Sequence, residues 1–241
     1  SLAIKFQDRP YPFFSKRINL TIYNRIQLKS DILKLMASKF NLIYPSFELV
    51  SAEIGDKNEN FFFVEERINQ DFFSNRNLPM IIFNNGFGGS LICFDSLKKE
   101  VLYSQLEKEL RKRTKLSATL KTQIKKNYSN FNDAIIKNNC AELKKYIDIN
   151  YYGRLNAFRV IFGSDGHGFS NENLEMSYDT ISHLFYPIPH RDVISTALDN
   201  CQSPYTFMDS TREIIPFWLI LDKDSDFLKI TNQQIAEFLL K

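Results

Sequence analysis

The sequence predicts an α+β protein with a small, mostly antiparallel sheet flanked by helices. Short apolar runs and alternating segments bounded by turn-forming residues predict the strands. Stretches with apolar residues at three- and four-residue spacing predict the helices. Hydrophobic residues make up 44% of the chain and charged residues 24%, which is the balance of a folded protein. A length of 241 residues suits one large domain or two ordinary ones.

The N-terminal segment predicts two strands and a helix. The first strand starts near Arg17 and places three apolar side chains on one face: Ile18, Leu20 and Ile22. Ser30 then opens a short helix whose apolar side chains follow the helical period: Ile32, Leu35, Met36 and Phe40. The apolar run 61–64 predicts a buried strand after an exposed turn at 55–58.

Residues 78–104 carry the most informative pattern, LPMIIFNNGFGGSLICFDSLKKEVLYS. The pattern predicts three short apolar strands separated by a glycine-rich turn and a charged turn. Gly86, Gly88 and Gly89 lie between strands and are not followed by a helix, so we expect turn residues and no phosphate-binding loop. Cys93, in the middle of a strand, is expected to be inert.

The remaining chain predicts a helix at 105–126, a second helix at 130–147 and a mixed, partly helical C-terminal domain. Strands are expected at 158–162 and 214–221, the latter with Pro216 at an edge or bulge. Thr231 and Gln234 predict a capping box that begins the last helix. The division expected from these elements is a domain at 1–104, a connecting basic helix at 105–126 and a second domain at 127–241.

The net charge of +3 is unevenly distributed. The segments 1–40 and 98–126 carry +6 and +7, whereas 41–97 and 141–241 each carry −5. The basic helix 108–126 could bind nucleic acid, which is one hypothesis for function, although a solvated helix face explains the same charges. The basic side chains at the start of this helix are Lys108, Arg111, Lys112, Arg113 and Lys115.

Composition also predicts the cellular compartment of the protein. The three cysteines are far apart and odd in number, which favours free thiols in a reducing compartment over disulfides or a zinc site. The longest apolar run, 214–221, is far shorter than the roughly 20 residues that span a bilayer. We therefore expect a cytoplasmic protein with no membrane partner, no cofactor and no metal.

A catalytic site could use the three histidines. Asp165, His167, His183 and His190 could form an acid–base or metal site, and His167 lies in a predicted loop. No pair of histidines has the spacing of ligands on one helix face, and no nucleophile elbow or P-loop occurs. Asp222, Asp224 and Asp226 alternate as calcium ligands do, but position six is Phe227 and position twelve is Gln233, so an acidic turn is expected. An enzyme, such as a hydrolase or effector domain, remains the alternative.

The segment from Leu78 to Asp95, followed by KKEVLY at 98–103, resembles the central strands of the SUKH superfamily of bacterial immunity proteins. In that family a strand leads through a glycine-containing bend to a strand that ends in Asp, and a further strand follows. Residues 35–47 resemble its early helix and the entry to its sheet. The match covers about 70 of 241 residues, and the usual tryptophan and N-G-G are missing or displaced.

This resemblance implies an immunity protein that binds a cognate interbacterial toxin and occludes its active site. Because many toxins that cut nucleic acid are basic, an acidic surface would favour fast and specific association. The most concentrated acidic stretch of the N-terminal half supplies the partner-binding residues we expect: Glu48, Glu53, Asp56, Glu59, Glu65, Glu66 and Asp71.

Overall fold

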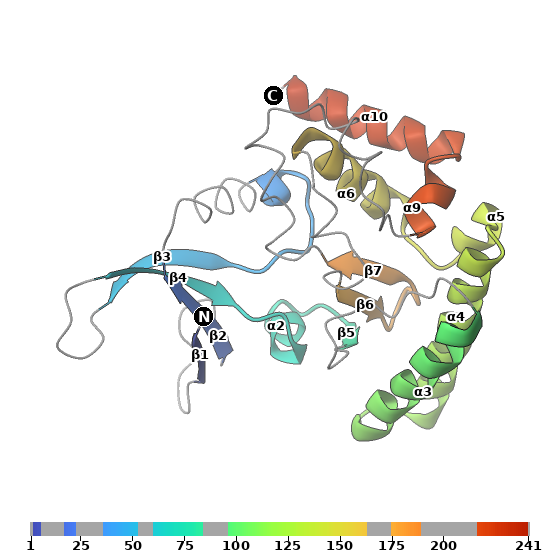
Figure 1. Ribbon diagram of the computed structural model, residues 1–241, viewed down its shortest axis with the longest axis horizontal. Helices are drawn as coiled ribbons and strands as arrows, with labels where there is room; N and C mark the ends of the chain where they lie inside the picture. Colours follow the sequence, from blue (N-terminus) through green and yellow to red (C-terminus); the bar gives the residue numbers. More distant parts are fainter. Residues whose placement is uncertain are drawn as a thin grey trace.

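The structure is a computed structural model that describes residues 2–5, 17–22, 36–52, 60–83, 96–162, 175–188 and 216–240. Within these ranges the chain is α+β, as the sequence predicts, with two antiparallel sheets beside a set of helices (Figure 1). The predicted turns at 55–58 and 86–89 and the residue Cys93 lie outside the described residues.

The first sheet has the strand order β1-β2-β4-β3. It contains β1 (Leu2–Lys5), β2 (Arg17–Ile22), β3 (Phe47–Ala52) and β4 (Asn60–Glu66), and each neighbouring pair is antiparallel. The strands predicted near Arg17 and at 61–64 are therefore confirmed. Residues 36–39 are helical, which agrees with the end of the predicted helix.

The second sheet joins distant parts of the sequence. Its order is β5-β6-β7, with β5 at Met80–Phe83, β6 at Glu175–Asp179 and β7 at Phe185–Ile188. Both pairs are antiparallel. Since β5 precedes the predicted connector 105–126 and β6 follows it, the two predicted domains 1–104 and 127–241 share this sheet.

The helices flank the second sheet (Figure 1). They are α2 (Gln70–Asn75), α3 (Ser96–Lys112), α4 (Ala118–Ile136), α5 (Cys140–Leu143), α6 (Ile149–Phe162), α9 (Pro216–Leu221) and α10 (Ser225–Leu239). Within the described ranges, α6 and α10 form the most extensive helix pair.

The predicted connecting helix is a helical hairpin. The run 98–103, expected to be a strand, belongs to α3, because Leu106 and Leu110 continue its pattern at a spacing of four and both are buried. The chain then turns at 113–117, and the Ser117 side chain accepts a hydrogen bond from the Leu120 amide at 3.1 Å as the N-cap of α4. The predicted helix 130–147 is divided between α4 and α5.

Three further predictions are corrected near the C-terminus. Residues 158–162 end α6 and residues 216–221 form α9, so neither run is a strand. Both runs are short and strongly apolar, and such runs look alike in a buried helix and a buried strand. Pro216 occupies the first turn of α9, where its missing N–H costs nothing. Thr231 lies inside α10, whose N-cap is Asp224.

Asparagine, and not glycine, ends three of the helices. Asn41, Asn77 and Asn138 have positive φ angles of 52°, 51° and 51° directly after helical segments. In each case the next amide donates back to the last turn, as Asn139 N does to the Ala134 carbonyl at 2.8 Å. This left-handed closure satisfies carbonyls that the helix leaves unpaired.

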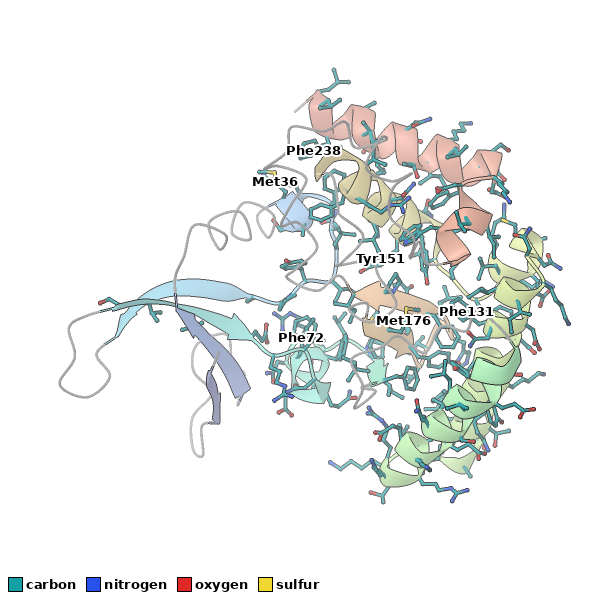
Figure 2. The ribbon with its side chains drawn as sticks, viewed as in Figure 1. Met36, Phe72, Phe131, Tyr151, Met176 and Phe238 are labelled. Atoms are coloured by element: carbon teal, nitrogen blue, oxygen red, sulfur yellow. The ribbon has the colours of Figure 1, made fainter. Side chains whose placement is uncertain are left out.

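The strand β5 is buried on both faces and separates two apolar clusters. Ile81 and Phe83 face the main core, which also takes residues from α3, α4, α6, β6, β7, α9 and α10. Met80 and Ile82 face a smaller cluster with α2. Figure 2 labels Phe131 on α4 and Met176 on β6, which belong to the main core, and Phe72 on α2, which belongs to the smaller cluster. The alternation of side chains along β5 therefore supplies residues to both apolar clusters.

Close packing of α6 against α10 depends on Gly153. A Cβ atom at this position would lie 2.5 Å from Cγ2 of Ile230, which is shorter than atoms in contact allow. We predict that Gly153→Ala lowers the free energy of unfolding by about 1–3 kcal/mol, because the added methyl overpacks this contact. Chemical denaturation measures the loss.

A double-mutant cycle identifies the cause of that loss. Adding Ile230→Ala to Gly153→Ala should make the glycine substitution almost neutral, because the clashing methyl group is gone. Equal costs of Gly153→Ala in the two backgrounds would contradict the steric explanation.

Candidate functional site

The predicted acidic surface is only partly described. Glu53, Asp56 and Glu59 lie outside the described residues, and Glu48 and Glu65 belong to β3 and β4. Asp71 is exposed in the first turn of α2, as a binding residue would have to be.

The prediction that Glu66 belongs to an exposed binding surface is wrong, because its side chain is not exposed. Its side chain is fully buried, and both carboxylate oxygens accept from the guanidinium of Arg76, at 2.8 Å and 2.5 Å. Arg76 also donates to the Ser46 hydroxyl at 3.1 Å and stacks 3.9 Å from the centroid of the Phe72 ring. This bidentate pair attaches the end of β4 to the end of α2.

Removing one partner of this ion pair should be costly. We predict that Glu66→Leu lowers the free energy of unfolding by about 3 kcal/mol, because Arg76 keeps its charge without its partner. The double variant Glu66→Leu/Arg76→Leu should recover part of that loss in chemical denaturation. A double variant less stable than Glu66→Leu would contradict this view of the pair.

Of the predicted catalytic group, the structure describes His183 alone. It lies in the turn between β6 and β7 with a φ of 62°, and it is exposed. Its Nδ1 is 3.0 Å from the hydroxyl of the buried Tyr178, which accepts a hydrogen bond from Asn127 at 3.0 Å. The Tyr178 hydroxyl and the His183 ring therefore share a hydrogen bond, in which the tautomer of the imidazole decides the donor. Asp165, His167 and His190 lie outside the described residues.

This arrangement orients His183 and provides no reactive pair. The neighbouring hydroxyl belongs to Tyr178, and burial raises the pKa of Tyr178 to about 12, so the phenol keeps its proton near neutral pH. Nδ1 of His183 is occupied by its hydrogen bond with this hydroxyl. In the described part of the chain, His183 therefore has a structural partner and no nucleophile to activate.

The aspartates of the predicted acidic turn lie beside basic side chains. Asp224 caps α10 by accepting from the Phe227 amide at 2.9 Å, and its other oxygen lies 2.6 Å from Nζ of Lys144. Asp222 lies 3.6 Å from the guanidinium of the buried Arg159, and burial raises the pKa of this carboxyl. Within the described ranges, no three His, Cys, Asp or Glu side chains are grouped as metal ligands.

The Asp224–Lys144 pair predicts a pH dependence of stability. The hydrogen bond from Lys144 lowers the pKa of Asp224, so the stabilisation is complete above the pKa of this carboxyl in the unfolded chain. It is lost as the pH falls through the lower folded pKa. Asp224→Asn keeps the cap and removes the charge, so we predict a loss of about 0.5–1 kcal/mol at neutral pH that disappears in acid.

Asp226→Asn is the matched control for this prediction. Asp226 is 77% exposed and lies 3.5 Å from Lys144, so its replacement should change the free energy of unfolding little at any pH. Urea denaturation of the three proteins between pH 3 and pH 7 tests both statements. A loss for Asp224→Asn that is the same at all these pH values would contradict the charge-based explanation.

Sequence reasoning missed an apolar surface at the C-terminal end of α10. Leu239 is 69% exposed and Leu240 is 87% exposed. Beside them, a cavity of about 270 Å³ opens between residues 36–40 and α10. Its lining residues are Met36, Lys39, Phe40, Gln234, Glu237 and Phe238. The available signal was the pair LL at 239–240, in which Leu239 belongs to the apolar face expected of the last helix.

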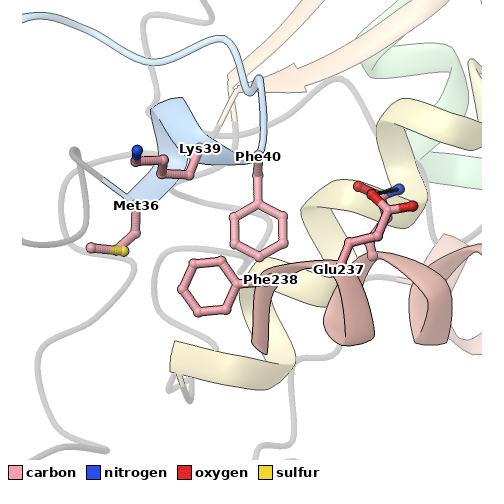
Figure 3. A pocket seen from close by; sticks show the side chains of 6 residues that line it. Met36, Lys39, Phe40, Glu237 and Phe238 are labelled. Atoms are coloured by element: carbon pink, nitrogen blue, oxygen red, sulfur yellow. Dashed lines mark hydrogen bonds between the residues drawn. The ribbon is translucent and has the colours of Figure 1, made fainter. Parts of the chain in front are cut away.

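Two stacked rings form one wall of this cavity. The centroids of Phe40 and Phe238 are 5.0 Å apart with an interplanar angle of 24°, and Figure 3 shows Met36 beside them. Lys39 and Glu237 place opposite charges among the lining residues. We call Leu239, Leu240 and this cavity the α10 apolar site. It offers an apolar hollow with charged neighbours, which suits an inserted side chain of a partner.

Comparison with protein-family models gave no match, and comparison with curated proteins gave none either. The SUKH resemblance therefore rests on the quoted residues alone, of which 98–103 lie in a helix. In the described part of the chain, no helix has the length and apolar character needed to cross a membrane.

Proposed function

We propose that this protein is a cytoplasmic immunity protein, which binds a cognate interbacterial toxin and occludes its active site without catalysing a reaction itself. The resemblance of Leu78 to Asp95 to the SUKH superfamily supports this class. The observation that carries the proposal is the α10 apolar site, because a cavity beside two highly exposed leucines is typical of a surface that receives another protein.

In the proposed complex, Leu239 and Leu240 supply much of the binding energy. Burying a leucine side chain in an interface is worth about 1.5–3 kcal/mol, so two leucines can supply the difference between weak and tight binding. In the proposed complex, an apolar side chain of the toxin enters the cavity between Met36 and Phe238, and the leucines cover it. The acidic residues outside this site, including Asp71, would then act on the rate of association.

Growth protection tests the proposal. Bacteria that express the cognate toxin should survive when the chain is co-expressed. We predict that Leu239→Gln/Leu240→Gln weakens toxin binding about 100-fold, measured by calorimetry with a catalytically inactive toxin, and abolishes protection.

The matched control is Val101→Gln/Ile181→Gln. It replaces two apolar residues that are 59% and 76% exposed elsewhere on the molecule, so binding and protection should persist. His183→Ala should also leave protection intact, since the proposed mechanism is occlusion. Equal loss of binding in both double variants, or no complex with the toxin, would contradict the proposal. Light scattering of the free protein detects the other possible occupant, a second copy of the chain.

A further inference from the structure

The end of the α3–α4 hairpin is the most strongly charged part of the described chain. Residues 105–126 contain eight Lys or Arg and two Glu, a formal charge of +6. The hairpin end lies far from α10 in Figure 1, and Figure 2 shows long side chains extending outward from it. We call residues 105–126 the basic hairpin.

The two glutamates neutralise only some of these cations. Glu107 lies 3.1 Å from Lys125 and 4.0 Å from Arg111, and Glu109 lies 2.7 Å from Lys112. Arg113 is used internally, since it donates to Gln70 at 2.8 Å and to a backbone carbonyl of β5.

Three exposed lysines of the basic hairpin have no ion-pair partner among the described residues: Lys108, Lys115 and Lys126. The ion pair between Glu107 and Lys125 brings these two helices side by side at one level. Lys108 and Lys126, each the next residue in its helix, are therefore also near that level. Lys115 lies in the turn between the helices, beyond the end of α3 about 6 Å from Lys108 and beyond the start of α4 about 12 Å from Lys126, at 1.5 Å per helical residue. The three charges thus belong to the same end of the hairpin.

The chemistry of this surface distinguishes between partners. The described residues with large exposed apolar side chains include none from 105–126. The apolar faces of α3 and α4 are buried in the main core through Leu106, Leu110 and Ile124. A protein partner would need an apolar interface centre, and a membrane would need an exposed apolar face. Nucleic-acid interfaces, in contrast, are polar and strongly positive.

The neighbouring exposed residues favour phosphate contacts over the reading of bases. Thr114 and Thr119 are exposed beside the lysines and can donate hydrogen bonds to phosphate oxygens. Tyr103, just outside the hairpin, packs near Tyr128 at a centroid distance of 6.4 Å. No exposed aromatic side chain of the basic hairpin is therefore present to stack on unpaired bases.

We infer that the basic hairpin binds the phosphate backbone of a nucleic-acid duplex without sequence preference. Lys108, Lys115 and Lys126 are the phosphate-binding residues. This interaction is independent of the proposed toxin binding, because the α10 apolar site lies elsewhere on the molecule (Figure 1).

Fluorescence anisotropy with labelled 20-base-pair DNA and RNA duplexes tests the inference on the full chain. The wild-type protein should bind both duplexes, with an affinity that falls as salt rises from 50 to 200 mM. For Lys108→Gln/Lys115→Gln/Lys126→Gln, the slope of log affinity against log salt should shrink by about 2.7, since each lost phosphate contact removes about 0.9. Circular dichroism establishes that each variant is folded.

The matched control is Lys137→Gln/Lys223→Gln/Lys229→Gln, which removes three exposed lysines and the same net charge from other surfaces. Its salt slope should equal that of the wild type. Should the triple variant fail to fold, each single Lys→Gln variant of the basic hairpin should still reduce the slope by about 0.9.

Three outcomes would overturn the inference. The first is no duplex binding by the wild type at 50 mM salt. The second is an equal change of slope in the control, which would indicate net charge and no defined surface. The third is binding to vesicles of anionic phospholipid without binding to either duplex. Leu239→Gln/Leu240→Gln should leave duplex binding unchanged, which separates this result from that of the toxin-binding experiment.

Discussion

The burial of β5 on both faces is the constraint on which the rest of the structure depends. Because successive side chains of a strand point to opposite sides, four residues supply two apolar clusters at once. The strand is paired with β6, which lies about a hundred residues later in the sequence. The main core is therefore built from residues far apart in the sequence, and the helices between the two strands pack into the same core.

Polar contacts attach the surrounding elements to this strand. Arg113 donates to a carbonyl of β5 and to Gln70, whose own amide donates to the Met80 carbonyl at 2.8 Å. The hairpin turn and α2 thereby satisfy backbone groups of β5 that β6 does not reach. The ion pair of Glu66 and Arg76 then joins α2 to the first sheet. Charged residues of the N-terminal half thus act in the assembly of the fold.

Because some charged side chains pair inside the protein, the candidate binding sites of the structure differ from those predicted from the sequence. Acidic and basic segments are visible in the sequence, but the sequence does not indicate which of their side chains form ion pairs or hydrogen bonds inside the protein. Glu66 and Arg113 form such contacts, whereas Lys108 and Lys126 are exposed. The α10 apolar site needed tertiary structure for a different reason. Its cavity forms between residues about 200 positions apart, so no local pattern could predict it.

The sequence by itself determined the α+β class, the strands near Arg17 and at 61–64, and the unequal distribution of charge. These features depend on local periodicity and composition, which are properties of the sequence that do not depend on tertiary contacts. Tertiary structure decided that 98–103, 158–162 and 216–221 are helical, because a short apolar run suits either conformation until its packing partners are known. It also decided which charges remain at the surface, since pairing across 10 to 80 residues depends on how the elements pack.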